Sequence, residues 1–202
     1  SGACRLCCVE IRGRRPWLTA CNTLVTDGLD VQTHSPAVEE NRRTLLELMA
    51  HDYPAEALVR EPDLEFQRWL RHYGVAPTVS IAPKLPRPFA DSTHPYIDAD
   101  LTRCITCFRC QRICEEVEGR SVWQSWDRGD ATRLRPDGPT LKDSSCVSCG
   151  ACVDTCPTGA LEDRSVQKLG APARWTRTTC PYCGVGCELN VGTRDGHIVQ
   201  VT

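Results

Sequence analysis

Eight cysteines near the middle of the chain have the spacing of iron ligands. The pattern C-x-x-C-x-x-C-x-x-x-C occurs twice, and Pro157 follows the second copy. A tight C-x-x-C-x-x-C turn can place three thiolates around one [4Fe–4S] cluster, while the fourth cysteine serves the other cluster. We therefore expect two clusters with exchanged fourth ligands. The first set is Cys104, Cys107, Cys110 and Cys156, and the second is Cys114, Cys146, Cys149 and Cys152.

Two other uses of these eight cysteines fit their spacing less well. A disulfide framework would suit a small secreted domain, but triplets at two-residue intervals crowd the thiols more tightly than pairing requires. Zinc sites usually contain isolated C-x-x-C pairs, whereas two quartets closed by C-P are typical of two-cluster ferredoxins. The pattern therefore favours iron–sulfur clusters.

A cysteine triplet also stands near the start of the chain. Cys4 and Cys7 form a C-x-x-C pair, and Cys21 supplies a ligand further along. Variants of the plant-type [2Fe–2S] pattern keep such a pair and move the outer two cysteines. We expect a [2Fe–2S] cluster here, with its fourth ligand upstream of Ser1 in a longer chain. Cys8 is expected to be a small buried apolar residue.

A second triplet stands near the end of the chain. Cys180, Cys183 and Cys187 have the spacing C-x-x-C-x-x-x-C. They predict three ligands of another [4Fe–4S] cluster, whose fourth ligand would lie downstream of Thr202. A zinc knuckle completed by His197 is the alternative.

Composition limits the classes of function open to the chain. Its 202 residues include 15 Cys, 14 Gly and 14 Pro, with only 6% aromatic residues, which predicts a loop-rich chain held together by metal. A formal charge of −2 favours neither nucleic acid nor an anionic membrane surface as partner. The sequence contains no run of about 18 apolar residues, so it predicts no membrane span. Thiols kept for clusters indicate a reducing compartment, most simply the cytoplasm.

The pattern between the cysteine motifs predicts an α+β chain of small modules. Val9–Ile11 and Leu29–Val31 are expected to be short strands. Ser35 as N-cap and Pro36 at the first helical position then predict a helix. Its apolar face is assigned to Leu45, Leu46, Leu48 and Met49.

A further helix is expected between Pro62 and Gly74. Four apolar residues recur there at i, i+3, i+4 and i+7, which indicates one packed face rather than a cofactor site. They are Phe66, Trp69, Leu70 and Tyr73. The prolines in residues 75–93 indicate an extended linker.

Two β-hairpins are predicted further along. One lies between the cysteine quartets, where Trp123 and Trp126 either shield a cluster from water or simply pack. The other spans residues 189–201, around a turn at 194–196. His94, just before the first quartet, is expected to make hydrogen bonds rather than to bind a cluster.

The order of these sites, together with T-T-C-P-Y-C-G-V-G-C at residues 178–187, resembles a known arrangement. It is similar to the N-terminal half of the catalytic subunit of cytoplasmic, NAD-dependent formate dehydrogenases, which belong to the molybdopterin oxidoreductase family. Iron-only hydrogenases and the large iron–sulfur subunit of complex I share the earlier modules. The resemblance implies oxidation of formate to CO2 at molybdenum or tungsten bound to bis-pterin guanine dinucleotide, in a part of the protein beyond this chain. It also implies a hetero-oligomer with a flavin- and NAD-binding iron–sulfur subunit.

The resemblance divides the chain into five segments. They are the C-terminal part of a [2Fe–2S] ferredoxin-like β-grasp domain (1–34), a helical segment (35–74), a linker (75–93), a two-[4Fe–4S] ferredoxin-like domain (94–168) and the start of a molybdopterin oxidoreductase [4Fe–4S] domain (174–202). No catalytic residue is expected within them, because the chain would carry only the electron relay.

The helical segment departs from the family pattern. The family usually places a cluster there through a motif resembling H-x3-C-x2-C-x5-C. This chain has the histidine of the motif, His51, but Ala55, Leu58 and Leu64 occupy the cysteine positions. We therefore expect this site to be empty, with Leu58 and Leu64 filling the space.

Two further classes of function stay open from the sequence. One is a stand-alone electron-transfer subunit with no catalysis of its own, including a fragment like the large subunit of complex I. The other is an interaction module stabilised by zinc.

Overall fold

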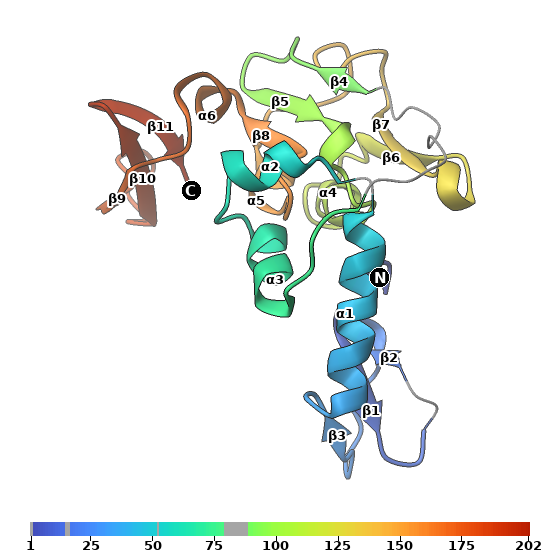
Figure 1. The fold of residues 1–202 in the computed structure, drawn as a ribbon. Helices are drawn as coiled ribbons and strands as arrows, with labels where there is room; N and C mark the ends of the chain where they lie inside the picture. Colours follow the sequence, from blue (N-terminus) through green and yellow to red (C-terminus); the bar gives the residue numbers. More distant parts are fainter. Residues whose placement is uncertain (1, 15–16, 52, 79–88) are drawn as a thin grey trace. The chain divides into compact units, whose positions relative to one another are not determined.

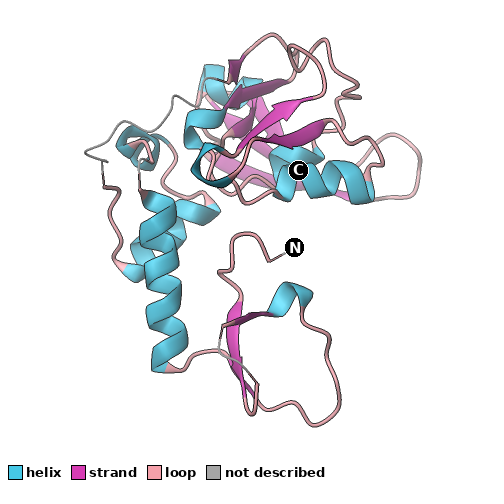
Figure 2. Ribbon diagram, turned by 90° about the vertical axis from the view of Figure 1, so that its right-hand side faces the viewer, coloured by secondary structure: helices cyan, strands magenta, loops and turns pink. Residues whose placement is uncertain are grey.

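The computed structural model describes residues 2–14, 17–51, 53–78 and 89–202. They belong to two compact units, residues 1–86 with 103–108 and residues 87–102 with 109–202, which we treat separately. Apart from one helix of 15 residues in the first unit, short helices and strands joined by loops make up both units (Figure 1, Figure 2), as expected for a chain rich in Gly and Pro. None of the described helices is both long and apolar enough to cross a membrane.

The first unit begins with a small antiparallel sheet. Its strands are β1 (Cys8–Ile11), β2 (Leu18–Thr19) and β3 (Val31–Gln32), in the order β2-β1-β3, with a 3-10 turn η1 (Ala20–Asn22) after β2. The strand expected at 29–31 thus begins only at Val31. Cys8 is 1% exposed, so the expected buried role is confirmed.

Three helices follow the sheet. They are α1 (Pro36–Ala50), α2 (Ala55–Arg60) and α3 (Glu65–Tyr73). The Ser35 hydroxyl accepts a hydrogen bond from Val38 N–H at 3.2 Å, as expected of an N-cap. α3 ends at Gly74, whose φ of +63° is the left-handed conformation that glycine adopts without strain. α3 begins at Glu65 rather than at Pro62, because the intervening residues form a turn.

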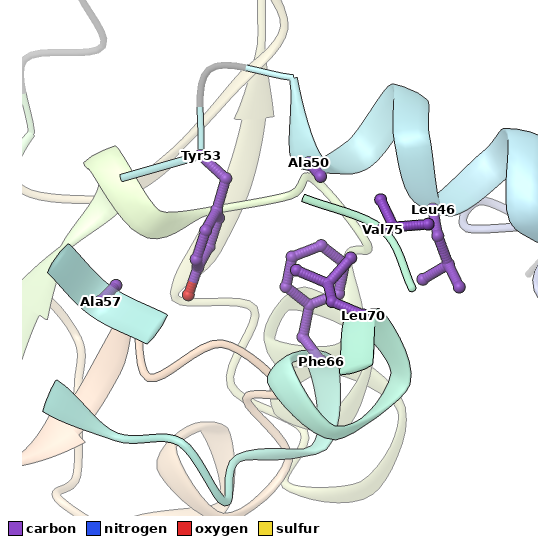
Figure 3. Close-up of a cluster of buried hydrophobic side chains, with 7 residues drawn as sticks. All are labelled: Leu46, Ala50, Tyr53, Ala57, Phe66, Leu70 and Val75. Atoms are coloured by element: carbon purple, nitrogen blue, oxygen red, sulfur yellow. The ribbon is translucent and has the colours of Figure 1, made fainter. Parts of the chain in front are cut away.

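These helices enclose an apolar core, shown in Figure 3. Phe66 and Tyr53 meet edge to face at a centroid distance of 5.1 Å, and Leu58 packs against the outside of the core. Leu58 and Leu64 are both half-buried; Leu58 packs against this core, and Leu64 precedes α3. That they fill the space of an empty cluster site stays a prediction. The core residues are Leu46, Ala50, Tyr53, Ala57, Phe66, Leu70 and Val75.

Two of the expected apolar faces are only partly buried. Leu48 on α1 is 67% exposed and Trp69 on α3 is 44% exposed. Both side chains point away from the core, which the same helices reach through other residues. The apolar face predicted from sequence periodicity was therefore too wide. Residues 79–88, which hold most of the expected linker, lie outside the described residues.

The second unit contains three groups of strands. A sheet of order β4-β5-β8 consists of β4 (Ala90–Asp91), β5 (Ile97–Asp100) and β8 (Leu161–Asp163). Strands β6 (Trp123–Trp126) and β7 (Arg133–Pro136) form the hairpin expected between the cysteine quartets, with a 3-10 turn η4 (Gly129–Ala131) between them. β4 lies in the segment where only linker was expected.

A third sheet stands near the end of the chain. It consists of β9 (Arg174–Thr179), β10 (Glu188–Arg194) and β11 (His197–Val201), in the order β11-β10-β9. Asp195 and Gly196 have φ of +49° and +80°, so a tight turn with two left-handed residues joins β10 to β11. The expected hairpin is confirmed, and β9 is an additional strand that sequence analysis missed.

Short helices carry the cysteine motifs of the second unit and connect its sheets. They are η2 (Leu101–Arg103), where the two units meet in sequence, α4 (Arg109–Arg112), the π-helical turn η3 (Ile113–Val117), α5 (Ala151–Asp154) and α6 (Arg164–Leu169).

The core around α1 and α3 generates a stability prediction. Phe66→Ala removes a ring that is 2% exposed and should lower the free energy of unfolding by about 3 to 5 kcal/mol, because the helices cannot close the cavity completely. Urea unfolding of the whole chain, followed by circular dichroism, measures this change. Val59→Ala, at a side chain that is 84% exposed, is the control and should change stability by at most about 0.5 kcal/mol. Equal effects of the two substitutions would contradict the assigned core.

Candidate metal centre

Four thiols from two distant parts of the chain line one cavity in the second unit. Cys114 comes from η3, Cys146 and Cys149 come from the loop before α5, and Cys152 comes from α5 itself. Apolar groups, including Ile97 and Val122, form much of the remaining wall. This is the set expected to hold the second [4Fe–4S] cluster, and the structure brings all four together. Four thiols around an apolar cavity suit a cluster chemically, because thiolates are its usual ligands.

The two C-x-x-C loops have the same backbone conformation. Thr106 and Ser148, each just before the second cysteine of its pair, have φ of +54° and +61°. Phe108 and Gly150, each just after it, have φ of +60° and +82°. A left-handed residue on each side of the central cysteine turns the chain sharply, so that successive thiols face one side. The repeated spacing is therefore also a repeated local structure.

Backbone N–H groups point at the first sulfur of each loop. Thr106 N–H donates to Cys104 Sγ at 3.3 Å, and Ser148 N–H donates to Cys146 Sγ at 3.4 Å. Such bonds favour the negatively charged form of sulfur. The turn therefore both positions the ligand and stabilises its thiolate.

Burial dominates the electrostatics of the four-thiol cavity. It raises the pKa of Cys152 to about 12, and the neighbouring thiols Cys146, Cys149 and Cys114 raise this pKa further. A hydrogen bond from Trp123 acts in the opposite direction. Burial likewise raises the pKa of Cys146. Four thiolates would repel one another in this space, so a positively charged metal core is what makes deprotonation favourable.

The loop before Cys146 is fixed by a dense set of hydrogen bonds. The Asp137 carboxylate accepts from Ser145 N–H at 3.1 Å and also from its hydroxyl, which joins the two ends of the loop. Asp91 on β4 accepts from Leu141 N–H at 2.6 Å. A Cβ added at Gly138 would lie 2.5 Å from the backbone oxygen of Asp143. Only glycine fits this close approach, which brings the chain back toward the cavity.

His94 connects β5 to the ligand loop. Its Nδ1 accepts hydrogen bonds from Tyr96 N–H at 3.2 Å and Ile97 N–H at 3.0 Å, so the ring proton is on Nε2. Nε2 lies 3.0 Å from Ser148 Oγ and donates to it. Burial lowers the pKa of His94, which favours this neutral form. The structure agrees with the expected hydrogen-bonded role, and its target, Ser148, is a residue that sequence analysis missed.

The ligands expected for the first [4Fe–4S] cluster are divided between the two units. Cys104 and Cys107 belong to the first unit, and Cys110 and Cys156 belong to the second, so this set stays a prediction. Cys156 Sγ lies 3.7 Å from the Thr158 hydroxyl.

An ion pair supports the backbone before Cys104. Arg103 Nη1 lies 3.5 Å from Glu61 Oε1, and the two side chains are only 5% and 9% exposed. Buried charges are retained when they are paired. This pair attaches the first ligand loop to the helical segment of its own unit, and nothing in the cysteine spacing could have predicted it.

The N-terminal triplet is also brought together. Burial raises the pKa of Cys7; a backbone hydrogen bond with Cys21 lowers it, and the thiols of Cys21 and Cys4 raise it. Gly2 N–H donates to Cys21 Sγ at 3.3 Å. The three residues thus share one site, and their binding of a [2Fe–2S] cluster remains a proposal.

The C-terminal triplet lies on an exposed loop. Cys180 N–H donates to the Cys187 carbonyl at 2.8 Å, which closes the loop between β9 and β10. Gly184 and Gly186, with φ of +76° and +82°, provide the tight turns inside it. Among the described residues, at this triplet and elsewhere, no group of three or more His, Cys, Asp or Glu side chains is placed to hold a single metal ion. The structure describes all fifteen cysteines and joins none of them in a disulfide.

Three family models match parts of the chain. Residues 1–36 match the 2Fe-2S iron–sulfur cluster binding domain, residues 94–162 match the ferredoxin-like domain of NADH-quinone oxidoreductase subunit 3, and residues 173–202 match the molybdopterin oxidoreductase Fe4S4 domain. The expected fold class, with [2Fe–2S] and [4Fe–4S] ferredoxin-like modules, is confirmed.

Among solved structures, the chain is similar to a chain of NAD+-reducing [NiFe]-hydrogenase in the H2-reduced state. The two are 31% identical with a TM-score of 0.64, and the match covers 81% of this chain and 70% of the other. The chain belongs to this family of iron–sulfur subunits of multi-subunit oxidoreductases.

Curated members of the family extend the comparison. A subunit of an NADH-quinone oxidoreductase of Rhizobium meliloti is 35% identical over 98% of this chain, and the alpha subunit of an NADPH-Fe(3+) oxidoreductase of Geobacter sulfurreducens is 35% identical over all of it. A Staphylococcus haemolyticus protein provisionally named formate dehydrogenase is 24% identical over 98% of the chain. The chain spans about a quarter of the length of these relatives, 24% in each case.

The exchange of fourth ligands generates a prediction about cluster loss. Cys114→Ala should abolish the same paramagnetic resonance signal as Cys146→Ala and lower the iron content by about four per chain, because both thiols face one cavity. Cys104→Ala should abolish a different signal. Iron analysis and resonance spectra of the anaerobically purified variants measure both effects. Loss of the Cys104 signal in the Cys114 variant, with the Cys146 signal intact, would contradict the exchange.

The close approach at Gly138 generates a second prediction for the same cavity. Gly138→Ala forces the backbone around Asp143 to move, because the new Cβ meets main-chain atoms that have no flexible end. The second cluster should then be incorporated to less than about half of the wild-type level, as measured by iron content after anaerobic reconstitution. Lys142→Ala, at an exposed position of the same loop, is the control and should leave iron content unchanged. Full incorporation in the Gly138 variant would show that the loop does not position Cys146.

Proposed function

We propose that the chain is the electron-relay region of a large iron–sulfur subunit in an oxidoreductase that exchanges electrons with a pyridine nucleotide. The observation that carries this proposal is the four-thiol cavity. Cys114 belongs to the first quartet in sequence but faces the thiols of the second quartet. A two-cluster ferredoxin requires each quartet to give its fourth cysteine to the other cluster. Separate zinc sites built from C-x-x-C pairs do not require this exchange.

The chain's own residues position and insulate the redox groups. Iron–sulfur clusters, when bound, accept and release single electrons. The left-handed turns present the thiols, the hydrogen bonds from Thr106 and Ser148 stabilise them, and the apolar side chains of Ile97 and Val122 cover part of the cavity. A rigid, largely apolar environment changes little when an electron arrives, which favours fast transfer.

The names of three family members support the choice of partner. An NADH-quinone oxidoreductase, an NADPH-Fe(3+) oxidoreductase and an NAD+-reducing hydrogenase all handle a pyridine nucleotide. We infer a hetero-oligomer in which a flavin-bearing, NAD(P)-binding subunit exchanges electrons with this chain. Cysteines that form no disulfide suit a reducing compartment, and we infer that the complex is in the cytoplasm.

Formate oxidation is a second candidate for the whole protein. It is favoured by the motif T-T-C-P-Y-C-G-V-G-C, by the match of residues 173–202 to the molybdopterin oxidoreductase Fe4S4 domain and by the Staphylococcus relatives. Under this proposal, a longer chain would hold molybdenum or tungsten on bis-pterin guanine dinucleotide, and electrons from formate would enter near Cys180, Cys183 and Cys187. The higher identity of the NAD(P)-linked relatives places it second.

Reduction of the native complex by different donors tests both candidates. The full-length protein is purified without oxygen together with its associated subunits, and NADH, NADPH, formate or hydrogen is added. We expect NADH or NADPH to bleach the iron–sulfur absorption and produce resonance signals, and formate to do so only if the second candidate holds. A colourless protein that contains zinc and no acid-labile sulfide would overturn the relay itself.

A further inference from the structure

His94 begins a short path of hydrogen bonds that ends at a ligand sulfur. Its Nε2–H donates to Ser148 Oγ at 3.0 Å, and Ser148 N–H donates to Cys146 Sγ at 3.4 Å. His94 is 3% exposed and lies 54 residues before Ser148 in the sequence. A buried side chain from outside the ligand loop thus contacts the residue whose backbone bonds to the first sulfur of that loop.

The imidazole of His94 is fixed by its own turn. Nδ1 accepts hydrogen bonds from Tyr96 N–H at 3.2 Å and from Ile97 N–H at 3.0 Å, where β5 begins. The His94 carbonyl accepts from Arg164 Nη1 on α6 at 2.9 Å. Because both the ring and the backbone are bonded, the ring cannot turn away from Ser148 without losing these contacts.

Ser148 has a backbone conformation that needs support from its surroundings. Its φ of +61° is unfavourable for a residue with a side chain, and such conformations persist where neighbouring contacts hold them. Thr106, the equivalent residue of the first ligand loop, has a φ of +54°, and its hydroxyl donates to the Ile105 carbonyl at 2.7 Å. At this position the first loop bonds to itself, and the second loop bonds to the turn that contains His94.

We propose that His94 is a positioning residue that raises the reduction potential of the second [4Fe–4S] site, by holding Ser148 so that its N–H bonds to Cys146 Sγ. The inference rests on the proposed function, because it assumes a cluster on the four thiols of the cavity. Reduction adds one electron from the donor to the cluster, and no bond forms or breaks. The added negative charge is shared by the ligand sulfurs, so an N–H bond to sulfur favours the reduced state.

His94 also caps the turn before β5, and three substitutions separate this role from the proposed one. The side-chain oxygen of asparagine can accept the same two backbone N–H bonds, but asparagine is too short to reach Ser148. His94→Asn therefore keeps the turn and removes the link. Ser148→Ala removes the link from the other side. Ser148→Thr keeps the hydroxyl and introduces a residue type that adopts this conformation at position 106 of the first loop.

Redox titration of the full-length protein with its clusters in place, followed by paramagnetic resonance, tests the proposal. His94→Asn and Ser148→Ala should each lower the equilibrium constant for reduction of the second cluster about threefold, which is a shift of about 28 mV to lower potential for one electron. The double variant should show the same shift as either single variant, because both substitutions remove one bond. The second-cluster signal is identified by its loss in Cys146→Ala.

Two controls accompany the titration. Ser148→Thr should keep the wild-type potential, and the signal of the first cluster should keep its potential in every variant. If His94→Asn does not retain the second cluster, Ser148→Ala decides the outcome. Loss of the second cluster in both, with Ser148→Thr fully loaded, would overturn the effect on potential, because the link would then be needed for assembly of the site.

The possible results distinguish this inference from the proposed function. An unchanged potential in the fully loaded variants, or an equal shift of both clusters, overturns the role of His94 and leaves the relay intact. Wild-type protein that shows no second cluster, with no iron lost in Cys146→Ala, overturns the relay and the role of His94 with it. A lower potential of the second cluster alone, equal in the single and double variants, supports both.

Discussion

Four sulfur atoms must converge on one small space, and this requirement shapes the whole second unit. Cys114 is fixed at the end of one motif, while Cys146, Cys149 and Cys152 arrive after a long insertion. The chain between them has to return within reach of η3, and it does so through the β6–β7 hairpin and the loop with the close contact at Gly138. Under the proposed function, metal ligation here would replace much of the apolar core that a module of this size otherwise needs.

The thiol cavity also explains why polar groups are buried around it. His94 and Asp91 are 3% and 6% exposed, yet neither is a cluster ligand in the expected sets. Each instead bonds to backbone or side-chain atoms of a loop that carries or precedes the second set of cysteines. Apolar side chains could fill the same volume but could not hold irregular backbone in one conformation. Hydrogen bonds therefore provide the rigidity that regular secondary structure provides in larger cores.

Spacing predicted which cysteines line one cavity better than it predicted the surroundings of that cavity. The exchange of Cys114 follows from the repeated quartet, and the hairpins follow from turn residues between alternating strands. The widths of the apolar faces on α1 and α3 were overestimated, because Leu48 and Trp69 fit the helical period without reaching the core. The link from His94 to Ser148 and the pair between Arg103 and Glu61 join residues far apart in sequence. No local pattern encodes such contacts, since they depend on which segments the fold brings together.

The two ligand loops differ in the residue just after their second cysteine, and the difference affects how each loop keeps its conformation. Phe108 adopts a left-handed φ of +60° where the second loop has Gly150 at +82°. A bulky residue pays about 1 to 3 kcal/mol for that conformation, whereas glycine adopts it freely. The first loop therefore depends on contacts with its surroundings, such as the buried pair of Arg103 and Glu61, to offset a conformational cost that the second loop does not carry. The same thiol spacing is thus held by outside contacts in one loop and by the choice of residue in the other.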